Sequence, residues 1–62
     1  MDICEFYLSE LEEYIAQRGI KKFRAKQIFQ WIHQKGVFDF YKMKNLPVKE
    51  SEWFCHEFEL AP

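Results

Sequence analysis

Basic side chains crowd one short stretch of the chain, and their type and spacing suit the binding of an anion. Residues 18–26 join a glycine-containing turn to the start of an amphipathic stretch, and five of these nine residues are Lys or Arg. The first N–H groups of a helix lack partners within the helix and carry the positive end of its dipole, so such a junction attracts phosphate. We therefore predict phosphate or nucleic-acid contact here. The alternative is that these are solvated lysines balanced by acidic neighbours.

The charge of the whole chain is strongly segregated. All nine Lys and Arg lie between Arg18 and Lys49, a stretch whose single acid is Asp39, so it carries +8. The first seventeen residues carry −5 and the last thirteen carry −4, which leaves a total of −1. Such asymmetry points to a polyanionic partner. The candidate residues for contact with phosphate or nucleic acid are Lys21, Lys22, Arg24, Lys26, Lys35, Lys42 and Lys44.

Catalytic and metal-binding residues are not predicted anywhere in these 62 residues. His33 and His56 have no Cys or His at metal-ligand spacing, and no C-x-x-C occurs. Cys55 stands next to His56, but adjacent helical residues point about 100° apart, so the pair is badly placed for nucleophilic catalysis. We interpret Cys55 as a small packing residue. The isolated chain is therefore predicted not to be an enzyme.

The compartment follows from the cysteines and from the hydropathy pattern. Cys4 and Cys55 are fifty-one positions apart, and small secreted scaffolds usually carry more bridges than one. The N-terminus is acidic and lacks an apolar run of signal-peptide length, and no segment approaches the roughly twenty apolar residues of a membrane span. We expect a monomeric cytoplasmic protein with two reduced thiols and no membrane contact.

The elements that must position the basic residues are helices. Apolar spacing predicts one all-α domain over 1–62, with main helices near 9–18, 24–35 and 47–58 and one extra short helical turn. Ser9 and Glu12 have the spacing of a capping box, and Gly19 and Gly36 are placed to end the first two helices. The predicted core residues are Leu11, Ile15, Ile28, Phe29, Ile32, Phe54 and Phe58.

Two further expectations concern the second helix and the segment after it. Trp31 shares a flank with Arg24 and Lys35, because i, i+7 and i+11 nearly superimpose on a helix. On that flank Trp31 could stack on a base, or it could close the edge of the core. Closing the core edge is the favoured interpretation in so small a domain. Asp39 is placed to cap the short turn, and Pro47 suits the first turn of the last helix.

The chain resembles a known family over nearly its whole length. The resemblance rests on FRAKQIFQWI at 23–32, on KGV at 35–37, on Phe40, Met43 and NLP at 45–47, and on the earlier LSELEEY at 8–14. These residues are similar to the N-terminal accessory domain of the radical-SAM 23S rRNA adenine-C2 methyltransferases, the RlmN family with its Cfr-type relatives. Two positions depart from the usual pattern: Glu50 stands where Leu is common, and Ser51 where Arg is common.

The resemblance implies a small domain of helix-hairpin-helix-like character ahead of a partial (β/α) barrel. That barrel binds a [4Fe–4S] cluster through C-x-x-x-C-x-x-C, uses S-adenosylmethionine and methylates an adenine of ribosomal RNA and tRNA. The N-terminal domain helps to engage the RNA, with Arg24 and Lys26 as the RNA-facing part. The chain would then be an N-terminal fragment of such an enzyme. The other hypothesis is a stand-alone interaction module whose +8 centre binds an acidic protein.

Because the three clustered cysteines are absent, the 62-residue chain should bind neither an iron–sulfur cluster nor S-adenosylmethionine. Reconstitution with iron and sulfide, followed by a visible absorption spectrum, checks the first point, and calorimetry with S-adenosylmethionine checks the second. A stoichiometric charge-transfer band would contradict the prediction.

Overall fold

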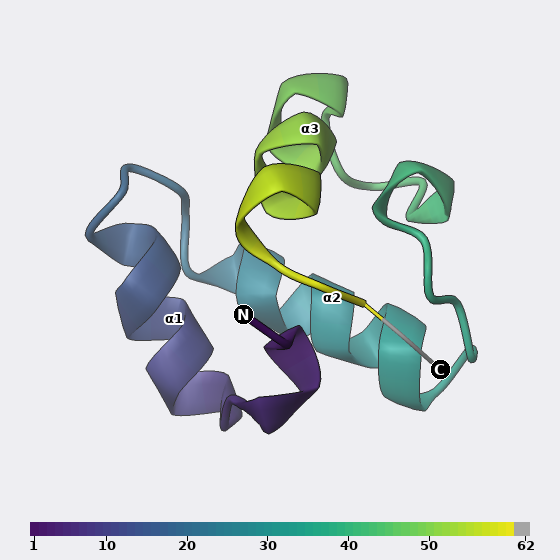
Figure 1. The fold of residues 1–62 in the computed structure, drawn as a ribbon, viewed down its shortest axis with the longest axis horizontal. Helices are drawn as coiled ribbons and strands as arrows, with labels where there is room; N and C mark the ends of the chain where they lie inside the picture. Colours follow the sequence, from purple (N-terminus) through teal and green to yellow (C-terminus); the bar gives the residue numbers. More distant parts are fainter. Residues whose placement is uncertain (61–62) are drawn as a thin grey trace.

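Helices account for all the regular structure in the described part of the chain. The computed structural model describes residues 1–60, with η1 (Ile3–Glu5), α1 (Leu8–Ala16), α2 (Phe23–His33), η2 (Phe40–Lys42) and α3 (Val48–Glu57) in chain order (Figure 1). No strand occurs within residues 1–60, where the β-type pairing is one isolated parallel bridge between Asp2 and Glu59. The all-α prediction is confirmed, and each observed helix end lies within two residues of the predicted one.

The start of α1 differs from the prediction. The helix begins at Leu8, with Tyr7 at the N-cap, so Ser9 lies inside the first turn and the predicted Ser9–Glu12 capping box is wrong. The carboxylate of Glu10 takes the capping role, because its Oε1 accepts a hydrogen bond from the Tyr7 N–H at 2.8 Å. Leu8 packs against the core from this first turn, which accounts for the earlier start.

The end of α1 follows the predicted role of Gly19. The Gly19 N–H donates to the carbonyl of Ala16 at 3.1 Å, and the Ile20 N–H donates to the carbonyl of Ile15 at 3.0 Å. These two bonds form a Schellman motif, which requires a left-handed residue at Gly19, where φ is +83°. The motif turns the chain after α1, and the next helix, α2, begins at Phe23.

One hydrophobic core joins all the elements. Six of the seven predicted core side chains are buried, whereas Phe29 is half-buried at the edge and meets His33 edge to face at 5.4 Å. The sequence pattern did not place Ile3, Phe40, Met43 and Leu46 in the predicted core list. The buried apolar residues are Ile3, Leu11, Ile15, Ala25, Ile28, Ile32, Phe40, Met43, Leu46, Phe54 and Phe58.

The elements pack in two pairs around this core. The backbones of α1 and α2 approach each other closely, and so do those of η2 and α3 (Figure 1). The predicted cap of η2 is confirmed, because Asp39 Oδ1 accepts from the Tyr41 N–H at 2.9 Å. Phe54 stacks with Phe40 at 5.6 Å and with Phe58 at 5.9 Å between ring centroids, so aromatic packing ties η2 to α3.

The first residues of the chain lie against its last described ones. Ile3 is fully buried, and its N–H donates to the carbonyl of Glu59 at 3.2 Å. Phe6 meets Phe58 edge to face at 5.5 Å, so the segment before α1 covers the C-terminal end of α3. Within residues 1–60, no helix is long and apolar enough to cross a bilayer.

Phe54 is the side chain whose loss should damage the fold most, because it is 0% exposed and contacts two other buried rings. Phe54→Ala should cost about 3–5 kcal/mol through the cavity it leaves. That is comparable to the whole stability of so small a domain, at about 0.05–0.15 kcal/mol per residue. Circular dichroism should therefore show no cooperative melting transition.

The matched control is Val48→Ala, at a position that is 67% exposed on α3. It should change the unfolding free energy by no more than about 0.5 kcal/mol. A cooperative Phe54→Ala transition near the wild-type melting temperature would contradict the core described here.

Candidate nucleic-acid interface

Most of the basic side chains have no carboxylate partner within the described residues. Ion pairs within residues 1–60 use three of the nine basic residues, namely Arg18, Lys22 and Arg24. The other six are exposed and have no carboxylate oxygen within 4.0 Å in that part of the chain. They are Lys21, Lys26, Lys35, Lys42, Lys44 and Lys49.

Arg24 occupies a structural network rather than open solvent. Its side chain is only 17% exposed, and its Nε lies 3.0 Å from Glu50 Oε1 on α3. Both atoms are buried and misaligned for a hydrogen bond, so they interact as an ion pair. The Nη1 group donates to Gln27 Oε1 at 2.9 Å and to the backbone carbonyl of Asn45 at 2.8 Å. RNA contact by Arg24 stays a prediction, and the guanidinium already has three partners.

The two departures from the family pattern are both accommodated. Glu50 supplies the carboxylate that pairs with Arg24. Ser51 is buried, and its Oγ donates to the backbone carbonyl of Phe40 at 3.3 Å. A side chain as large as Arg would not fit at this buried position without movement of η2.

Asn45 connects the flank of α2 to the turn before α3. Trp31 Nε1 donates to Asn45 Oδ1 at 2.7 Å, while the Asn45 carbonyl accepts from Arg24. Lys35 Nζ lies 4.2 Å from the centroid of the Trp31 ring. Trp31 is half-buried against the core, as the favoured interpretation predicted. Arg24 and Lys35 therefore share one flank of α2 with Trp31, and Asn45, which follows Lys44 in the chain, contacts the same flank.

The N-terminal end of α2 presents side chains more than backbone amides. The N–H groups of Arg24 and Ala25 donate to the carbonyls of Lys21 and Lys22, each at 3.0 Å. These two amides are therefore not turned toward a bound anion. Lys22 Nζ lies 3.0 Å from Glu13 Oε1 on α1, and the hydrogen bond to Glu13, followed by its charge, raises the pKa of Lys22.

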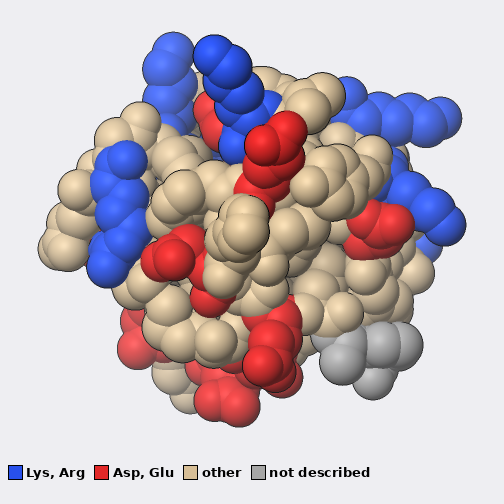
Figure 2. Space-filling model, turned by 45° about the horizontal axis from the view of Figure 1, so that its top comes forward, with Lys and Arg blue, Asp and Glu red and all other residues tan. Residues whose placement is uncertain are grey.

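Two basic residues lie away from this flank. Arg18 is on the α1 side. Its guanidinium carbon lies 3.6 Å from the centroid of the Tyr14 ring, and its Nε lies 3.9 Å from Glu57 Oε1. Lys42 belongs to η2, which packs against α3 rather than α2. Figure 2 shows one face of the molecule, with Lys and Arg projecting from the upper edge and the sides, and with Asp and Glu at the lower edge and also among the basic side chains at the upper centre and right.

Phe23 is a surface feature that the sequence interpretation missed. It is the first residue of α2 and 47% exposed, and the Arg24 guanidinium carbon lies 4.7 Å from its ring centroid. The sequence held the signal, because Phe23 falls outside the apolar stripe of Ala25 and Ile28 and is flanked by Lys22 and Arg24.

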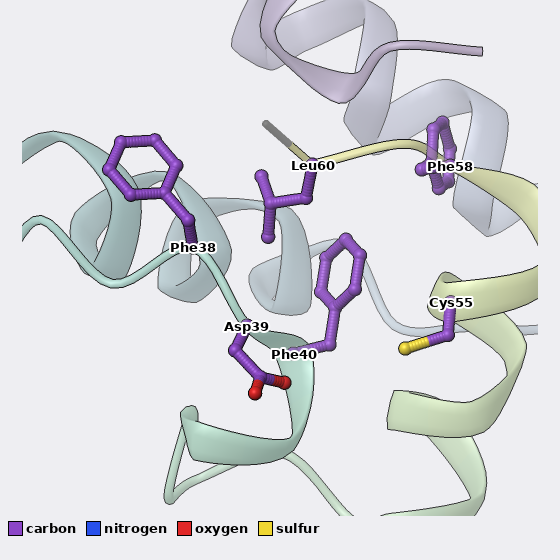
Figure 3. A pocket seen from close by; sticks show the side chains of 6 residues that line it. All are labelled: Phe38, Asp39, Phe40, Cys55, Phe58 and Leu60. Carbon is purple, nitrogen blue, oxygen red and sulfur yellow. The ribbon is translucent and has the colours of Figure 1, made fainter. Parts of the chain in front are cut away.

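A separate pocket of about 260 Å³ lies between η2 and the C-terminal end of α3 (Figure 3). Its lining residues are Phe38, Asp39, Phe40, Cys55, Phe58 and Leu60. The Asp39 carboxylate is engaged as the cap of η2, and the Cys55 thiol is exposed and not in a disulfide. Within residues 1–60, no three His, Cys, Asp or Glu side chains are grouped to hold a metal ion.

Comparison with known proteins gives a consistent result. The family described as "Ribosomal RNA large subunit methyltransferase N-terminal domain" matches residues 1–52. A "Probable dual-specificity RNA methyltransferase RlmN" of Clostridium botulinum (strain Okra) is 44% identical over 60 residues, which cover 97% of this chain and 18% of that protein. A "Dual-specificity RNA methyltransferase RlmN" of Campylobacter hominis is 46% identical over 60 residues, covering 97% of this chain and 16% of that protein.

The fold has a solved counterpart. A crystal structure of a radical SAM methyltransferase from Sphaerobacter thermophilus superposes with a TM-score of 0.93 and 32% sequence identity, over 100% of this chain and 18% of that one. The three helices therefore define a small helical domain of the kind found in radical SAM methyltransferases. The chain belongs to the family of ribosomal RNA large subunit methyltransferase N-terminal domains. It spans less than a fifth of the length of these relatives.

Arg24→Ala should destabilise the fold, because it removes the partner of Glu50 and two charged hydrogen bonds. The expected loss is about 1.5–3 kcal/mol of unfolding free energy, the usual contribution of hydrogen bonds to charged groups. Lys26→Gln, an exposed replacement on the same helix, should stay within about 0.5 kcal/mol of wild type. Urea denaturation measures both. If Arg24→Ala were as stable as Lys26→Gln, the network would not hold α3 to α2.

Proposed function

We propose that this chain is the RNA-engaging N-terminal domain of a dual-specificity adenine-C2 methyltransferase of the radical SAM class. In this proposal the whole enzyme methylates ribosomal RNA and tRNA, and the domain grips and orients the RNA through phosphate contacts. The proposed contact residues are Lys21, Lys22, Arg24, Lys26, Lys35, Lys42 and Lys44. The observation that carries the proposal is the family match over residues 1–52.

Charge supports the RNA-binding part of the proposal. Six exposed lysines have no carboxylate partner in residues 1–60, and five of them are proposed contact residues. Because no ion pair engages these six side chains within residues 1–60, their charges are available to phosphates, although the chain as a whole carries −1. Contacts of this kind fix the position and orientation of a nucleic acid but do not read its sequence. Target selection would therefore belong mainly to the remainder of the enzyme.

The chemistry would also belong to that remainder. The cluster of a radical SAM enzyme needs three grouped thiolates, and this chain has two cysteines, Cys4 and Cys55, fifty-one positions apart. These residues do not fit the cluster. We propose that a radical-SAM barrel C-terminal to this domain holds it, together with S-adenosylmethionine. We further propose that the protein is a cytoplasmic monomer.

The second candidate is a module that binds an acidic protein. The same six lysines favour it, because a carboxylate-rich surface would also offset their charge. Competition separates the two functions. A single-stranded RNA and a polyglutamate of equal charge should be compared as competitors: tighter binding of the RNA favours the RNA-engaging domain, and tighter binding of the polyglutamate favours the protein-binding module.

The salt dependence of RNA binding tests the phosphate contacts. With four phosphates neutralised, log K should fall against log salt with a slope of about −3, at roughly −0.7 per contact for a single strand. Replacing Lys21, Lys26 and Lys44 together with Gln should reduce the slope by about 2 and weaken binding to all sequences alike. These three residues are exposed and outside the ion pairs, so the fold should be unaffected.

Lys49→Gln is the control for a single charge, because Lys49 is exposed, also lacks an ion pair within residues 1–60 and lies outside the proposed contact set. The salt slope of Lys49→Gln should match that of wild type. Lys26→Gln alone should make the slope shallower by about 0.7. An unchanged affinity and slope in the triple variant would refute the phosphate contacts and favour the protein-binding module.

A further inference from the structure

Among the exposed aromatic residues of the described chain, one lies in basic surroundings. Tyr7, Phe23 and Tyr41 are the large aromatics exposed to solvent. Tyr7 adjoins the Glu10 carboxylate, which accepts its N–H. Desolvation raises the pKa of Tyr41, and the neighbouring Cys55 thiol and the carboxylates of Glu52 and Asp39 raise it further, so acidic side chains lie close to that hydroxyl. Neither position suits a polyanion.

Phe23 has the opposite environment. Lys21 and Lys22 precede it, Arg24 follows it, and Lys26 lies one turn further along α2. Residues three apart on a helix are neighbours, so Lys26 flanks the ring on the exposed side. The ring is outside the hydrophobic core and the side chains packed against it. Burial of apolar surface therefore accounts for only part of this aromatic side chain, since 47% of the residue stays exposed.

One face of the ring is already occupied by a cation. The Arg24 guanidinium carbon lies 4.7 Å from the ring centroid, within the range of a cation–π contact. The bonds of Arg24 to Gln27, Asn45 and Glu50 hold that guanidinium in place. The ring is thus supported on one side while 47% of the residue stays exposed. A second flat group could stack on the exposed surface without competing with the core.

We propose that Phe23 is a stacking platform for an unpaired base, so that the ligand of this surface is single-stranded RNA rather than duplex. This inference rests on the proposed RNA-binding function and adds the ligand class. Exposed aromatic rings interleaved with basic side chains are the usual means of binding single strands, in which phosphates meet cations while bases stack. A paired base within a duplex is stacked on its neighbours and is not available to the ring.

Trp31, the stacking candidate from sequence, is less suited to this role. Its ring is half-buried against the core, its Nε1 is bonded to Asn45, and Lys35 Nζ lies over its face at 4.2 Å. Phe23 has no comparable set of partners apart from Arg24.

The test compares three labelled ligands with the 62-residue chain by fluorescence anisotropy. They are a mixed-sequence single-stranded RNA, an abasic strand of equal phosphate number, and a duplex of equal phosphate number. Wild type should bind the base-bearing strand about 5- to 150-fold more tightly than the abasic strand, the range expected for stacking of one base. Phe23→Leu should remove that preference and leave abasic binding unchanged, whereas Phe23→Tyr should retain it.

Circular dichroism melting of both variants shows whether the fold is intact, and Val48→Ala serves as an exposed apolar control. Stacking is refuted if wild type binds the base-bearing and abasic strands equally, or if Phe23→Leu keeps the preference for the base-bearing strand. In either case, binding that weakens with salt would still support phosphate contact. Tighter binding to the duplex than to the single strand would also overturn the inference. If none of the three ligands binds at low salt, both the inference and the proposed function fail.

Discussion

The hydrophobic core shared by all the elements is the constraint on which the arrangement of this domain depends. The closest backbone contacts join α1 to α2 and η2 to α3, and the hydrogen bonds of Asn45 add a link between α2 and the start of α3. Asn45 precedes α3 and accepts from two residues of α2, Trp31 through its side chain and Arg24 through its backbone. Arg24 then reaches Glu50 on α3 itself. In a chain of 62 residues the core alone is small, so such links have a large share in fixing α3.

Such links also decide which charges face outward. Arg18 and Arg24 are held by aromatic rings and carboxylates, so both arginines serve the fold. The planar guanidinium suits that task, because it binds several acceptors at fixed angles and stacks on rings. The lysines carry the positive charge of the surface instead. In the proposed function, this division would let the domain keep a rigid scaffold while its flexible lysines adapt to an RNA strand that is itself flexible.

The sequence predicted the helices well because its signals were local. Gly19 and Gly36 mark turns by adopting positive φ, and Asp39 marks one by the acceptor on its side chain, and the structure uses all three there. Ser9 misled the prediction, because the capping motif is satisfied two residues earlier, by Tyr7 and Glu10, once Leu8 packs on the core. The burial of Ile3 and the role of Asn45 depend on contacts between distant segments, which periodicity does not encode. The basic cluster was visible in the sequence, whereas the split between structural arginines and exposed lysines needed the fold.

The most direct test of the central claim is to map the RNA-binding surface by NMR. Amide and side-chain shifts of the labelled chain would be followed during titration with a single-stranded RNA. The account predicts the largest changes at Lys21, Phe23 and Lys26, with further changes at Lys35 and Lys44, and little change in α1 or around Cys55. Changes confined to α1, or to the pocket between η2 and α3, would contradict it.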